Sequence, residues 1–188
     1  MSMKVTFIIV PGYTNSGPEH WQSHIERKYQ RVLRVQQDDW FSPKREPWMQ
    51  RLNETIDSVE GPVFLIGHSC GAVTISQWAE KYHCDRITGA LLVAPADVDS
   101  PDIPEDIIVQ RPLAFQPLPF PTTVVCSDND EFLSYRKARQ LAESWGASLI
   151  TLPGAGHLHT AAGFGEWPDG EALINRLSGQ QLIARSDA

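Results

Sequence analysis

The sequence predicts a doubly wound α/β fold, in which a mostly parallel sheet of about six strands is flanked by helices. Short apolar runs alternate with longer stretches whose apolar residues recur every three or four positions, the spacing of one helix face. The short runs are nearly all apolar, which is typical of parallel strands covered on both faces. A chain of 188 residues is long enough for one such core. No lid domain is visible between the strands, so we expect a single domain over residues 1–188 without a cap.

The first half of the chain contains three predicted strands and two predicted helices. Residues 5–10 form a β-branched and aromatic run that a Pro-Gly pair ends. A shorter strand is expected over residues 31–36, and a third over residues 63–66. Between them, Pro18 suits the start of one helix and Pro47 the start of another, each followed by a single apolar stripe.

The second half continues the alternation of strands and helices. We expect strands at residues 87–94, 122–127 and 148–152, and helices at residues 72–82, 135–145 and 171–177.

Two segments do not follow this pattern. Residues 96–121 contain six prolines and several acids, which excludes regular secondary structure throughout. We expect a long loop there that lines one edge of the functional site. The tail, residues 180–188, lacks a clear apolar pattern, and we expect it to fray.

Composition excludes several classes of function. The net charge of −7 and the pI near 5.3 disfavour a nucleic-acid or anionic-membrane partner. No apolar run approaches the roughly 20 residues that span a bilayer, and the N-terminus lacks the apolar region of a signal peptide. The three cysteines show neither metal-ligand nor disulfide-framework spacing. We therefore expect a reduced, cytoplasmic protein.

A Gly-x-Ser-x-Gly motif at residues 67–71 carries the strongest functional signal. An apolar strand leads into it and a helical pattern begins directly after it, which is the arrangement of a nucleophile elbow. In such a turn the neighbouring backbone comes so close that side chains at Gly67 and Gly71 would collide with it. Ser69 is therefore the candidate nucleophile.

The two strands nearest the end of the chain provide candidate partners for this serine. Acidic residues 128–131 follow the strand at 122–127, and a Gly-Ala-Gly-His sequence ending at His157 follows the strand at 148–152. Functional residues of open α/β sheets lie at the carboxyl ends of strands. The sequence thus predicts that a serine, an acid and a histidine meet at one edge of the sheet.

These residues give the chain a resemblance to the α/β-hydrolase superfamily, in which the catalytic residues occur in the order Ser, Asp, His. Within it, the chain resembles the small cap-less serine hydrolases called retinoblastoma-binding-protein-9-like or YdeN-like. The resemblance covers nearly the whole chain. It depends on residues 10–12, His20-Trp21, residues 67–71, residues 127–130, Gly156-His157 and residues 163–170.

The resemblance implies a Ser-Asp-His triad, but the sequence contains two candidate acids. Many superfamily members have an Asp-Pro pair followed by two apolar residues, whereas Asp130 is followed here by Glu131. Aligning Phe132 and Leu133 with the apolar pair favours Asp130 as the triad acid. Asp128 is the alternative, and its structural role would be to close an Asx-type turn.

The mechanism that the resemblance implies is hydrolysis of a small ester or amide by acyl transfer. His157 would take the proton of Ser69 and return it to the leaving group, while Asp130 would orient the imidazole. Backbone N–H groups of Cys70 and of Tyr13, in the loop after the first strand, would hold the oxyanion. No metal or organic cofactor is required.

Other residues near these motifs have weaker functional cases. His159 is the alternative to the proposed catalytic histidine. We expect His68 and Trp167 to contact a substrate pocket, and His20-Trp21 to pack a helix near its mouth.

Two other classes of function remain open at this point. A non-catalytic protein-binding module on a hydrolase scaffold is the main alternative, since fold alone does not decide function. Dehalogenation or lyase chemistry is disfavoured, because a halide-transfer nucleophile would normally be an acid. The expected partner is a small-molecule acyl substrate, and the oligomeric state stays open.

Overall fold

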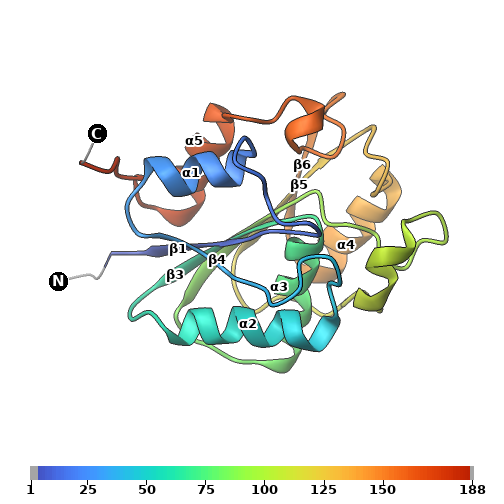
Figure 1. Ribbon diagram of the computed structural model, residues 1–188, viewed down its shortest axis with the longest axis horizontal. Helices are drawn as coiled ribbons and strands as arrows, with labels where there is room; N and C mark the ends of the chain where they lie inside the picture. The colour runs from blue at the N-terminus through green and yellow to red at the C-terminus, as the bar shows by residue number, and fades with distance from the viewer. Residues whose placement is uncertain (1–3, 187–188) are drawn as a thin grey trace.

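The computed structural model describes residues 4–186 and contains one six-stranded sheet in the order β2-β1-β3-β4-β5-β6 (Figure 1). All neighbouring strands are parallel, so the predicted fold class is confirmed. The strands are β1 (Thr6–Val10), β2 (Val32–Arg34), β3 (Val63–His68), β4 (Ile87–Val93), β5 (Thr122–Ser127) and β6 (Ser148–Leu152).

Helices cover both faces of the sheet because side chains alternate along the buried strands. On β3, Val63 and Leu65 face one core and Phe64 and Ile66 face the other. The first core is closed by α2 (Arg45–Asp57), α3 (Cys70–Lys81) and α4 (Tyr135–Trp145). The second is closed by α1 (Trp21–Lys28) and α5 (Pro168–Ser178), which lie together on the other side of the sheet in Figure 1.

Several boundaries differ from the predicted ones. Helix α2 begins at Arg45, which places Pro47 in the first turn, where a backbone N–H has no helical partner anyway. Helix α5 begins at Pro168 rather than near residue 171. Strand β6 is not buried on both faces: it is an edge strand, and Ser148 and Thr151 are exposed.

The segment over residues 96–121 is less irregular than expected. It contains a 3₁₀-helix, η1 (Glu105–Gln110), which is tied to α3 by two buried amides. The Gln77 side chain donates to the Gln110 carbonyl at 2.7 Å, and the Gln110 side chain donates to the Cys70 carbonyl at 2.9 Å. These bonds hold η1 next to the start of α3, beside the proposed nucleophile.

The C-terminal tail is hydrogen-bonded to the body of the domain as far as the structure describes it. The Val5 N–H donates to the side chain of Gln180, and the Arg185 N–H donates to the carbonyl of Lys28. This differs from the expected fraying over residues 180–186, whereas residues 187 and 188 lie outside the described residues. No helix in the described part of the chain combines the length and apolar character needed to cross a membrane.

Candidate active site

Ser69 lies on the sharp turn between β3 and α3, with the strained dihedral angles φ 57° and ψ −124°. The predicted steric role of both glycines is confirmed. A Cβ on Gly67 would lie 2.8 Å from the Cα of Ala72, and one on Gly71 would lie 1.9 Å from the Val10 carbonyl oxygen. Only glycine fits at these positions, and the turn holds the Ser69 side chain at the carboxyl edge of the sheet.

The structure brings Ser69, His157 and Asp130 into one hydrogen-bonded series. His157 Nε2 lies 2.8 Å from Ser69 Oγ, and His157 Nδ1 lies 3.0 and 2.9 Å from the two carboxylate oxygens of Asp130. A carboxylate only accepts, so the ring proton is on Nδ1 and Nε2 is free to accept from the serine hydroxyl. The Asp130 side chain is completely buried, and one of its oxygens also accepts from the Phe132 N–H at 2.8 Å.

Asp128 has a different partner, which is the loop that presents His157. The side chains of residues 127–129 accept hydrogen bonds from the backbone N–H groups of residues 154–156. In this loop Gly154 and Gly156 have φ of 63° and 58°, which favours glycine. The bonds run from Gly154 to Asp128, from Ala155 to Ser127 and from Gly156 to Asn129, at 2.7, 2.9 and 2.7 Å.

A cavity of about 450 Å³ opens above Ser69. Its walls come from the β1–α1 loop, the end of β3, the segment over residues 96–121, and the loops after β5 and β6. Residues 96–121 contribute through Ala96, Pro104 and Ile107. Apart from histidines, Glu131 is the only lining residue with an acidic or basic side chain of the Asp, Glu, Lys or Arg type. The cavity therefore suits an uncharged substrate.

Three further histidines line this cavity, and each has a lowered pKa, which favours its neutral form. Burial, with His159 and Arg34 nearby, lowers the pKa of His20 to about 3. Burial also lowers the pKa of His68 well below its usual value and lowers that of His159. His68 Nε2 donates to the His157 carbonyl at 2.9 Å, so His68 supports the backbone of His157 as well as lining the cavity.

Trp167 does not line the cavity above Ser69, contrary to our expectation. Its indole packs edge-on against Trp21, with ring centroids 5.1 Å apart, and lines a separate cavity beside α5. It also occupies the space in front of Gly170, where a Cβ would lie 2.3 Å from the indole ring. Trp167 therefore packs the start of α5 onto the second core.

The two predicted oxyanion donors come from the start of α3 and from the β1–α1 loop, and both residues line the cavity. Cys70 is the first residue of α3, where backbone N–H groups have no partner within the helix. Tyr13 lines the cavity and follows Gly12, where a Cβ would lie 2.9 Å from the His68 carbonyl oxygen. Burial raises the pKa of the Cys70 thiol to about 12, so this thiol is not a nucleophile at neutral pH.

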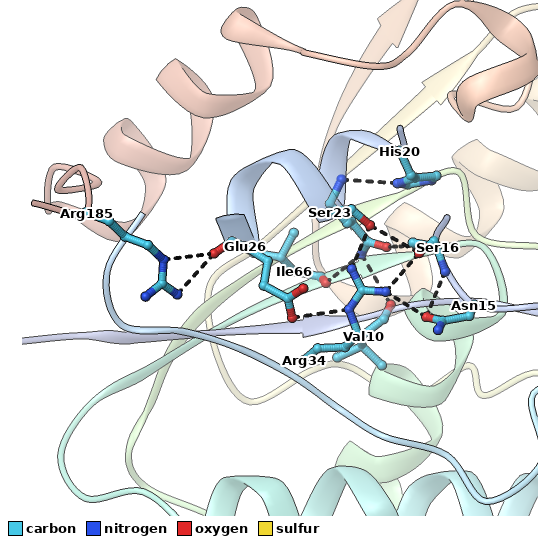
Figure 2. Close-up of polar contacts among 10 residues, drawn as sticks. Val10, Asn15, Ser16, His20, Ser23, Glu26, Arg34, Ile66 and Arg185 are labelled. Carbon is cyan, nitrogen blue, oxygen red and sulfur yellow. Dashed lines mark hydrogen bonds and ion pairs between the residues drawn. The ribbon is translucent and has the colours of Figure 1, made fainter. Parts of the chain in front are cut away.

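Sequence reasoning missed a buried polar network behind the β1–α1 loop, shown in Figure 2. Arg34, at the end of β2, donates to Asn15 Oδ1 and the Ser16 carbonyl, each at 2.8 Å, and to Ser23 Oγ at 2.6 Å. The fully buried Gln22 accepts from Ser16 Oγ at 2.6 Å. No local sequence signal marks these residues, because they come together only in the folded chain.

Comparisons with known proteins give matches in sequence and in fold. Residues 7–176 match the sequence profile of a family described as serine hydrolase. A YdeN-like hydrolase from Pectobacterium atrosepticum has 32% identity and a TM-score of 0.83, and the match covers 94% of this chain and 91% of that one. The ydeN gene product of B. subtilis has 19% identity and a TM-score of 0.70, with coverage of 95% and 100%. Est1E from Butyrivibrio proteoclasticus has 16% identity and a TM-score of 0.66, with coverage of 95% and 86%. No curated protein matches the sequence significantly.

Proposed function

The chain belongs to the serine hydrolase family, and from this premise we propose that it hydrolyses small, uncharged esters or amides through Ser69, His157 and Asp130. The observation that carries the proposal is the 2.8 Å contact between His157 Nε2 and Ser69 Oγ at a strained elbow. A nucleophile within hydrogen-bond reach of a base, which a third group orients, is the arrangement that activates a serine.

In the first step Ser69 Oγ attacks the substrate carbonyl while His157 Nε2 takes the hydroxyl proton. The imidazolium then forms beside the buried carboxylate of Asp130, which stabilises it and fixes the ring orientation. His157 returns the proton to the leaving group, which departs as an alcohol or amine and leaves an acyl ester on Ser69. Water, activated by the same histidine, then hydrolyses that ester.

The negative charge of the tetrahedral intermediate would be held by the backbone N–H groups of Cys70 and Tyr13. The amino end of α3 adds a favourable dipole at this point. Loss of one such donor typically costs about 2.7–4 kcal/mol of transition-state stabilisation. The position of the β1–α1 loop therefore matters for the rate.

The first test is reaction of the wild type with a fluorophosphonate probe, together with turnover of short and long p-nitrophenyl esters. We expect stoichiometric labelling that Ser69→Ala abolishes. The acyl-length profile then measures how much of the 450 Å³ cavity the substrate fills. A folded wild type that neither reacts with the probe nor turns over esters would overturn the mechanism and favour a binding scaffold.

A matched pair of variants tests the assignment of the acid. Asp130→Asn keeps the shape of the side chain but leaves His157 Nδ1 without a carboxylate, and we expect kcat to fall by a factor on the order of 10³–10⁴. Asp128→Asn retains an oxygen that can accept from the Gly154 N–H, so we expect a change of less than about 10-fold. The reverse order of effects would show that Asp128 is the triad acid.

A further inference from the structure

The loop that carries Tyr13 is held in a strained conformation. Thr14 and Asn15 have φ of 67° and 68°, in the left-handed region that non-glycine residues rarely adopt. Such a conformation costs about 1–2 kcal/mol per residue, so the surrounding structure has to maintain it. Because Tyr13 directly precedes this pair, relaxation of the pair would shift the backbone of Tyr13, including its N–H.

Arg34 contacts the second residue of the strained pair and the residue that follows it. Its guanidinium donates to the Asn15 side chain and the Ser16 carbonyl, and both bonds are 2.8 Å long. Figure 2 shows the guanidinium between these acceptors and Ser23 and Glu26 of α1. The Arg34 side chain is only 9% exposed, and Glu26 pairs with it at 3.3 Å. Several donors in a fixed planar fork restrain a loop more tightly than a single bond would.

The same network also connects the loop to the strand that bears the nucleophile. Ser16 Oγ donates to Gln22 Oε1 at 2.6 Å, and Gln22 Nε2 donates to the carbonyl of Ile66 on β3 at 3.1 Å. Ser23 Oγ, which accepts from Arg34, donates in turn to the Ser16 carbonyl at 3.1 Å. The relative position of the β1–α1 loop and the elbow is thus set by one buried set of hydrogen bonds.

We propose that Arg34 is a positioning residue that keeps the Tyr13 N–H in register with the Cys70 N–H by bracing the strained β1–α1 loop. This inference rests on the proposed function, because it assigns a task to the loop in the hydrolytic mechanism. Arg34 acts through Asn15 and Ser16 and does not line the cavity itself. Its removal should therefore weaken transition-state binding more than substrate binding.

The test compares Arg34→Ala with Arg86→Ala in steady-state hydrolysis of a short p-nitrophenyl ester. Arg86 is a matched control: its guanidinium also donates to two acceptors, the carbonyls of Gly61 and Ile56, but at the start of β4, away from the cavity. We expect Arg34→Ala to lower kcat by about 10- to 100-fold. Complete loss of one oxyanion donor lowers kcat by up to about 10³-fold, and here the Tyr13 N–H is displaced rather than removed. KM should stay within about twofold. Arg86→Ala should lose stability and keep its kcat.

Chemical rescue separates positioning from general destabilisation. Guanidinium chloride at a concentration well below the denaturing range should raise the kcat of Arg34→Ala relative to the same ionic strength of sodium chloride. It should leave Arg86→Ala unchanged. Arg34→Lys, with a single ammonium in place of the fork, should lie between wild type and Arg34→Ala.

The outcomes distinguish this inference from the proposed function. An inactive wild type would overturn the proposed function. An active wild type with unchanged kcat in folded Arg34→Ala, or equal losses in Arg34→Ala and Arg86→Ala, would overturn the positioning role alone. Should Arg34→Ala not fold, Ser23→Ala removes two bonds of the same brace, those to Arg34 and to the Ser16 carbonyl, and an unchanged kcat there would also count against the role.

Discussion

Replacement of His20 by asparagine should make the protein less sensitive to mild acid. His20 caps α1: its Nδ1 accepts from the Gln22 N–H at 3.1 Å. Asparagine is also a favourable capping residue, so the variant keeps an acceptor for this N–H while removing the titrating ring. The change therefore isolates the protonation of His20 from its structural role.

The magnitude follows from the pKa of His20, which burial, with contributions from His159 and Arg34, lowers from 6.5 to about 3. His157 and His24 also lower this pKa, and the His68 ring lies 4.7 Å away, so other imidazoles and a guanidinium surround the ring. Between these two pKa values the unfolded chain binds a proton that the folded protein does not, so stability rises with pH in this window. At about pH 5 the difference amounts to about 2 kcal/mol of unfolding free energy.

Urea denaturation at about pH 7.5 and pH 5, followed by tryptophan fluorescence, measures this difference. We expect wild type to lose about 2 kcal/mol more than His20→Asn over this interval. The lowered pKa values of His68 and His159 affect both proteins and largely cancel in the comparison. Parallel pH dependences, within about 0.5 kcal/mol, would refute the burial of a neutral His20.

Two further predictions concern the elbow. Gly71→Ala should cost about 3 kcal/mol or more of unfolding free energy, because its Cβ would lie 1.9 Å from the Val10 carbonyl oxygen. Gly17→Ala, where no atom lies within 4 Å of the added Cβ, should change stability by less than about 1 kcal/mol, and similar urea midpoints for both variants would contradict the steric argument. Alkylation of the folded protein with iodoacetamide at about pH 8 should modify the partly exposed Cys84. It should spare Cys70, because burial raises the pKa of that thiol to about 12. Peptide mapping that finds Cys70 modified in the folded protein would show that its thiol is accessible and reactive.

The fold class could be predicted because the relevant signals are local. Apolar strand-like runs and helix stripes fix which residues form elements, and Gly and Pro mark their ends. The exposure of β6 could not be predicted, since only the strand order shows that this strand lies at an edge. The start of α2 at Arg45 escaped notice because a proline inside the first turn is as acceptable as one at its first position.

Part of the candidate site could be predicted from two facts: the order of the residues in the chain, and the position of functional residues at the carboxyl ends of strands. They identify Ser69, His157 and an acid after β5, but the choice between Asp130 and Asp128 depends on side-chain directions in the loop between β5 and α4. The proximity of Trp167 to His157 in the sequence predicts a place at the cavity, whereas packing against Trp21 of α1 decides its actual place. Arg34 had no signal at all, because its partners are 8 or more residues away in the chain.

The hydrogen bonds of the C-terminal tail have a consequence for engineering. Gln180 and Arg185 lie against the start of β1 and the end of α1, so the two ends of the described chain meet at the amino edge of the sheet. Figure 1 shows both ends of the described chain, residues 4 and 186, on the side of the molecule away from the carboxyl ends of the strands. An affinity tag or fusion partner at either end therefore leaves access to Ser69 open. Joining the ends with a short linker and opening the chain at an exposed loop tip, such as residues 83–85, offers a circular permutant with an unobstructed cavity.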